Sequence, residues 1–83
     1  MKWIKFENEK PELHKSRNET GEHIGDASKL LLVYGNGSVF VDYYVEFSDK
    51  FKELNPTAKD GWSYSKFEVT HWCDIPSRPE DEQ

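Results

Sequence analysis

Cysteine, basic side chains and long apolar runs are all scarce in this sequence of 83 residues. Cys73 is the single cysteine, so no disulfide can form within the chain, which excludes the disulfide-stapled class of small secreted domains. No apolar stretch approaches the roughly 20 residues that a transmembrane helix needs. The opening segment MKWIKFENEK also lacks the apolar run of a signal peptide. We therefore expect a cytoplasmic protein without a membrane partner.

Acidic side chains outnumber basic ones by 16 to 11, which gives a net charge of −5. Proteins that bind nucleic acid cluster Lys and Arg against phosphates, whereas the most basic region here, KWIKFENEKPELHKSR, interleaves them with glutamates. The sequence thus disfavours direct nucleic-acid binding. An acidic surface of this kind suits contact with a basic surface of another protein.

Aliphatic residues are few, but aromatic residues make up 14% of the chain. Aromatic side chains bury large areas each, so they can supply a core for one small domain spanning 1–83. Two polar segments stand outside that pattern. Residues 7–29 contain few apolar side chains and are predicted to form a long loop, and the proline-bearing residues 77–83 are predicted to form a flexible tail.

The clearest structural signal is the segment LLLVYGNGSVFVDYYVEF, in which two strand-like runs flank Gly35-Asn36-Gly37. These turn residues adopt positive φ readily, and the segment therefore predicts a β-hairpin of about 30–34 and 38–46. Alternation on its second strand separates two faces. One face carries Val39, Val41, Tyr43 and Val45, and the other carries Phe40, Asp42, Tyr44 and Glu46.

The remaining elements complete a fold of the α+β, mostly β class. Phe47, Phe51 and Leu54 follow a helical period, and Ser48 or Asp49 could cap its start, which predicts one short helix near 48–55. The segment WSYSKFEVTHWCDI predicts a last strand at about 64–73. We expect one small antiparallel sheet of three or four strands, partly covered by the helix.

His71 and Cys73 pose the main chemical question. Alternation places them with Val69 and Ile75 on the more apolar face of the last strand, so we interpret both as packing residues. A zinc site needs about four ligands, and the other histidines, at 14 and 23, show no ligand spacing. A nucleophilic pair needs the thiolate beside the imidazole, which neighbours two apart on a strand rarely provide. We therefore predict no catalytic, cofactor or metal residues.

The opposite faces of the hairpin and the last strand give a candidate binding surface. Phe40, Tyr44 and Trp72 would form an aromatic stripe with an acidic rim, a composition typical of protein-binding surfaces. The candidate partner-binding face comprises Phe40, Asp42, Tyr44, Glu46, Trp72 and Asp74. Because a small domain needs its aromatics for burial, the alternative is that Trp3, Ile4 or the helix covers this stripe.

Three segments together carry a resemblance to a known family. WIKFENEKP at 3–11, LLVYGNGSVFVDYY at 31–44 and VTHWCDIPSRP at 69–79 resemble small phage and prophage proteins grouped as domain of unknown function 551. The likeness covers nearly the whole chain, and the His-Trp ending is its most specific part. The resemblance implies a cytoplasmic protein of a phage, or of a bacterium carrying prophage genes, and it implies no particular reaction.

The chain departs from the family pattern at several positions. Lys10 stands where leucine is typical before Pro11, Asp74 and Arg78 replace prolines, and the 14–28 segment is longer. Cys73 replaces a methionine, which agrees with a packing role because methionine fills cores and is not a nucleophile.

These observations favour a non-enzymatic, acidic accessory protein that binds another protein. The alternative is an inhibitor of a host defence or nucleic-acid-handling complex that acts as an acidic decoy. A small metal protein or Cys/His enzyme centred on His71 and Cys73 is less favoured. A further hypothesis is a module of an oligomer that associates through an exposed sheet edge, with the oligomeric state left open.

Overall fold

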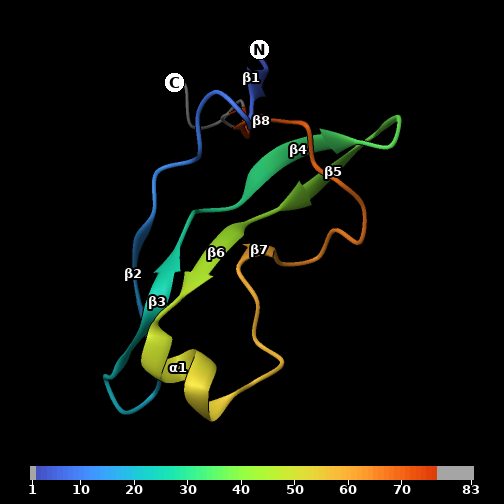
Figure 1. Cartoon of the computed structure of the whole chain (residues 1–83). Helices are drawn as coiled ribbons and strands as arrows, with labels where there is room; N and C mark the ends of the chain where they lie inside the picture. The colour runs from blue at the N-terminus through green and yellow to red at the C-terminus, as the bar shows by residue number, and fades with distance from the viewer. Residues whose placement is uncertain (1, 77–83) are drawn as a thin grey trace, which may run out of the picture.

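The computed structural model describes residues 2–76, which form two four-stranded antiparallel sheets and one short helix (Figure 1). The mostly β class with one helix is therefore confirmed, but the strands divide between two sheets where one was predicted. The first sheet has the order β1 (Ile4–Lys5), β8 (His71–Asp74), β4 (Leu31–Gly35), β5 (Ser38–Asp42). The second has the order β2 (His14–Arg17), β3 (His23–Ala27), β6 (Tyr44–Phe47), β7 (Gly61–Trp62).

A long two-stranded ribbon belongs to both sheets and joins them (Figure 1). β3 continues into β4, the chain turns, and β5 continues into β6. The predicted hairpin is confirmed: β4 and β5 pair in register around a two-residue turn in which Asn36 and Gly37 have φ of 49° and 77°. Positive φ at both positions is what this tight turn requires, which explains the Asn-Gly sequence.

The ribbon bends where its two buried polar side chains lie. Ser28 Oγ accepts a hydrogen bond from Tyr44 N at 2.9 Å, and the Asp42 carboxylate accepts one from Tyr43 N at 2.7 Å. These side chains give partners to backbone groups where the regular ladder is interrupted. β5 therefore ends at Asp42 and β6 begins at Tyr44, although the sequence predicted one straight strand.

The prediction that 7–29 is one long loop is wrong from residue 14 to residue 27, which form the β2–β3 hairpin. The turn is built by Asn18, whose Oδ1 accepts hydrogen bonds from Thr20 N at 3.0 Å and Glu22 N at 2.9 Å. Because most of the β2 side chains are exposed, the strand needs no apolar alternation. Its stability comes from backbone pairing to β3, which in turn pairs with β6.

Helix α1 (Asp49–Leu54) confirms the predicted helix, and of the two candidate caps it is Ser48 whose Oγ accepts a hydrogen bond from Phe51 N at 3.2 Å. Asp60 then ties the returning chain to the second sheet. Its carboxylate accepts from Phe47 N at 2.9 Å and from Lys52 Nζ at 3.0 Å. The hydrogen bond from Phe47, followed by the one from Lys52, lowers the pKa of Asp60 below its usual value.

The predicted last strand at 64–73 is wrong over most of its length. Only β8 (His71–Asp74) is a strand there, and at the start of the predicted range Tyr64 N and Ser65 N donate to the Asp42 carboxylate and not to a neighbouring strand. The predicted tail at 77–83 lies outside the described residues. The core beneath the first sheet consists of Leu31, Val33, Val69 and Trp72, with Ile4, Phe6, Trp62 and Phe67 packed around it.

Candidate functional site

The candidate partner-binding face does not form one exposed surface. Asp42 has no exposed surface, and Tyr44 and Trp72 are buried, so the prediction of a shared open face is wrong for these three residues. Tyr44 packs against Phe6 and Trp62 with ring centroids 5.2 and 5.3 Å apart. Phe6 and Trp62 therefore cover Tyr44, whereas the alternative had named Trp3, Ile4 or the helix as the cover.

The other three residues of the predicted face are accessible but separate. Phe40 is exposed and contacts Phe67, with ring centroids 5.0 Å apart. Glu46 lies 3.8 Å from Lys10 Nζ, and Asp74 lies 3.3 Å from Lys29 Nζ. Ion pairs this exposed contribute little stability, so these carboxylates remain available to solvent or to a partner.

His71 and Cys73 lie on the outer face of the first sheet, opposite to the predicted core face. Register shows this, because Val33 pairs with the core residue Trp72, while Tyr34 pairs with His71. The His71 Nδ1 lies 2.8 Å from Thr70 Oγ1, and its ring meets Tyr34 edge-on at 6.0 Å. The alternation pattern predicted the wrong face because Val69, which the pattern used as a core position, precedes β8 and is not part of it.

Cys73 is buried despite its outer position, as the packing interpretation expected. Burial raises the pKa of its thiol, and the negative charge of Asp74 raises it further. The thiol therefore stays protonated at neutral pH and is a poor nucleophile.

We expect Cys73 in the folded protein to react with a maleimide at least roughly a hundredfold more slowly than in the urea-unfolded chain, because reaction requires local opening. The measurement is the rate of labelling followed by mass spectrometry at neutral pH. Equal rates in the two states would contradict the buried, protonated thiol.

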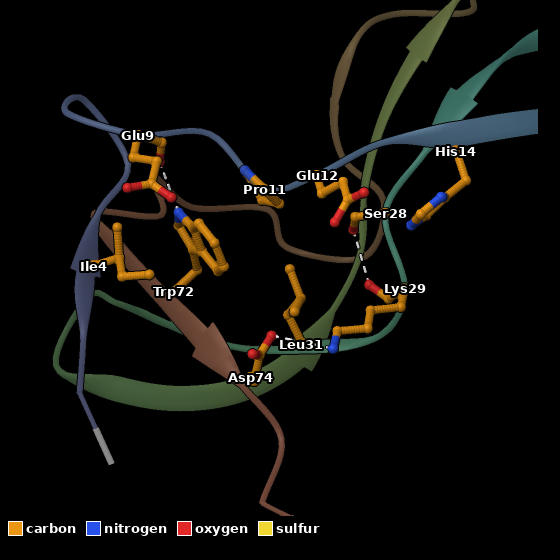
Figure 2. A pocket seen from close by; sticks show the side chains of 10 residues that line it. All are labelled: Ile4, Glu9, Pro11, Glu12, His14, Ser28, Lys29, Leu31, Trp72 and Asp74. Atoms are coloured by element: carbon orange, nitrogen blue, oxygen red, sulfur yellow. Dashed lines mark hydrogen bonds and ion pairs between the residues drawn. The ribbon is translucent and has the colours of Figure 1, made fainter.

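A cleft of about 340 Å³ lies between the first sheet and the segment that leads into β2 (Figure 2). Trp72 forms part of its wall beside Ile4 and Glu9, and its indole Nε1 donates a hydrogen bond to the Glu9 carbonyl at 2.8 Å. The cleft is lined by Ile4, Glu9, Pro11, Glu12, His14, Ser28, Lys29, Leu31, Trp72 and Asp74. In this cleft Trp72 and Asp74 of the predicted face lie beside residues of the segment 7–29, which was predicted to be a loop.

The cleft offers ionic and hydrogen-bonding groups around an apolar floor. Glu9, Glu12 and Asp74 are acidic, while Lys29 is basic and is paired with Asp74. Among residues 2–76, no three His, Cys, Asp or Glu side chains gather closely enough to hold a metal ion. The sequence pointed to this site only through Trp72 and Asp74, and a buried indole N–H such as that of Trp72 usually finds an acceptor. That signal does not identify the acceptor.

One set of exposed large apolar side chains within residues 2–76 lies on the β4–β5 hairpin. We call it the hairpin patch, and it consists of Tyr34, Val39, Phe40 and Val41. Val39, Phe40 and Val41 expose 53%, 46% and 49% of their surface, respectively. Because Val39 and Val41 point to one side of the sheet and Phe40 to the other, both sides of β5 are apolar and open. Contiguous exposed apolar side chains commonly mark contact surfaces.

No helix within the described part of the chain combines the length and apolarity needed to cross a bilayer. Comparison with protein-family models, with curated proteins and with solved structures found no match.

Proposed function

We propose that this protein is a small acidic accessory protein that acts without catalysis, by binding another protein through the hairpin patch. The observation that carries the proposal is the exposure of Tyr34, Val39 and Val41 on one side of the first sheet. A chain with so few aliphatic residues leaves such side chains in water at a cost, unless a partner covers them.

The neighbouring side chains extend this surface. Trp3 and Tyr34 lie with ring centroids 6.1 Å apart, and His71 adjoins Tyr34, so three aromatic rings continue the apolar side of the hairpin. Tyr and Trp are enriched at the centres of protein interfaces because they combine large apolar area with a polar tip. The net charge of −5 favours a partner whose surface is basic around its apolar centre.

The resemblance to small phage and prophage proteins sets the proposed context. In it, the protein acts in the cytoplasm of a bacterium, and the partner belongs to the host or the phage. The acidic-decoy alternative needs carboxylates concentrated on one face, whereas the exposed carboxylates are spread along the chain from Glu7 to Asp74, over loops, strands and helix α1. Glu46 and Asp74 are each also paired with a lysine. We therefore put the hairpin patch, and not charge mimicry, at the centre of the proposal.

Affinity capture from bacterial lysates, prepared with and without an induced prophage, tests this function. Tyr34→Ala is expected to weaken capture of the partner by roughly 30-fold or more, as truncation of a central interface tyrosine commonly does. Tyr64→Ala is the matched control, because Tyr64 is more exposed than Tyr34 and lies outside the patch. Equal capture by both folded variants would contradict the proposal.

A further inference from the structure

The two sheets have four edge strands, and three of them are protected against pairing with another chain. β1 and β7 are only two residues long, and β2 carries the exposed charges of Lys15 and Arg17. Short edges and charged side chains are the usual devices that prevent edge-to-edge association. β5 has neither device: it is five residues long, and its only charged residue, Asp42, is turned inward and buried.

The register identifies which backbone groups of β5 face outward. In a two-residue hairpin the residues flanking the turn, Gly35 and Ser38, exchange hydrogen bonds, and pairing then alternates along the strand. Ser38, Phe40 and Asp42 therefore bond to β4, whereas the N–H and C=O groups of Val39 and Val41 point away from the sheet. Within residues 2–76, no backbone hydrogen bond outside the strand pairing satisfies these outward groups.

We infer that β5 pairs antiparallel with β5 of a second copy of this chain, around a two-fold axis at Phe40. In that register Val39 lies opposite Val41 of the second copy, and the two residues exchange both of their hydrogen bonds. The symmetry repeats the exchange on the other side of Phe40. Every outward backbone group of Val39 and Val41 in both copies then has a partner, and the two first sheets become one continuous sheet.

The side chains fit the same register. Opposed valines place β-branched side chains together on the outer side, and opposed phenylalanines meet in a non-hydrogen-bonded pair, where side chains approach most closely. Each Phe40 already contacts Phe67, so four aromatic rings join beneath the new sheet. No ionised side chain faces another across this strip, although each copy carries a charge of −5. The dimer therefore strengthens as salt screens the charges elsewhere.

A second copy is the occupant because the sequence Val-Phe-Val at 39–41 reads the same in both directions. Two-fold pairing at Phe40 therefore places valine opposite valine and phenylalanine opposite phenylalanine, so like apolar side chains meet at all three positions, and an unrelated strand would have to supply the same apolar order. This inference rests on the proposed function for the role of the hairpin patch. It adds that a second copy of the chain pairs with the neighbouring edge of β5. Pairing the edges leaves the outer side of Tyr34, Val39 and Val41 open, and the dimer presents that side twice.

Sedimentation equilibrium of the purified protein between about 1 µM and about 1 mM tests the inference, a range that covers moderate self-association. The wild type is expected to shift from monomer to dimer, with no larger species, because two-fold pairing consumes the edge. Val39→Pro deletes one outward N–H in each copy and no bond to β4. Compared with Val39→Thr, which keeps the N–H, it is expected to raise the dimer dissociation constant by roughly 5- to 150-fold.

A monomer throughout the concentration range, or equal dissociation constants for the two Val39 variants, would overturn the inference. If circular dichroism shows that Val39→Pro does not fold, Val41→Lys compared with Val41→Thr gives the same test through a charge placed at the edge. Tyr34→Ala is expected to dimerise like the wild type, because β5 separates Tyr34 from the second copy. If the protein is a monomer but still captures another protein, this inference is wrong and the proposed function stands. If it is a dimer that captures no other protein, the proposed function is wrong and this inference stands.

Discussion

Asp42→Ala is expected to leave most of the protein unfolded at room temperature. The Asp42 carboxylate is fully buried and accepts hydrogen bonds from Tyr43 N at 2.7 Å, from Tyr64 N at 2.9 Å and from Ser65 N at 2.7 Å. Alanine leaves these N–H groups without an acceptor, at roughly 1–3 kcal/mol each. A domain of this size has a margin of only about 3–5 kcal/mol, so the loss is comparable to the whole stability.

Two further variants separate the causes of that loss. Asp42→Asn keeps the shape and one acceptor oxygen, so we expect an intermediate loss in the free energy of unfolding. Asp74→Ala removes an exposed carboxylate paired only with Lys29, and it should cost no more than about 1 kcal/mol. Urea unfolding followed by tryptophan fluorescence measures all three. Similar unfolding midpoints for Asp42→Ala and Asp74→Ala would disprove the structural role of Asp42.

Asp42 also shows where sequence reasoning reached its limit. The turn residues Asn36 and Gly37 and the cap Ser48 act on their immediate neighbours, so the hairpin and the helix could be predicted from local chemistry. Asp42 instead acts on Tyr64 and Ser65, far along the chain. Alternation alone made it an acidic rim residue, because the bend at Tyr43 was not visible in the pattern.

The candidate site divides in the same way. The sequence selected Trp72 and Asp74, and both line the cleft, but their partners Glu9 and Lys29 came from segments without a periodic signal. The β2–β3 hairpin escaped prediction for a related reason. Its exposed strands are stabilised by backbone hydrogen bonds, and backbone groups are identical in every sequence.

The open edge at β5 depends on topology as well as on composition. The alternation of Val39, Phe40 and Val41 was readable, and an exposed edge was one of the hypotheses for assembly. That β5 would be the edge follows only from β8 pairing on the other side of β4. Such long-range pairing cannot be deduced from the hairpin sequence alone.

Gly25→Ala is expected to lower the free energy of unfolding by about 2–4 kcal/mol, through crowding and backbone strain together. Gly25 sits in β3 with φ of 154°, between Ser16 of β2 and Phe47 of β6. A Cβ there would run into the Glu46 carbonyl oxygen and lie 2.8 Å from Phe47 Cα. Both contacts are backbone, so no side chain can rotate away, and β3 must separate from β6.

Gly21→Ala is the matched control for this prediction. Gly21 also has positive φ, at 86°, but a Cβ at that position meets no atom within 4 Å. The loss in the free energy of unfolding of Gly21→Ala should therefore reflect conformational strain alone, about 1 kcal/mol. Urea unfolding of both variants measures how much more free energy of unfolding Gly25→Ala loses than Gly21→Ala, and this difference is the effect of crowding. Equal losses of free energy would show that a Cβ fits between β3 and β6. A larger loss at Gly25 would show that close backbone packing holds β3 against β6, next to the bend where Ser28 meets Tyr44.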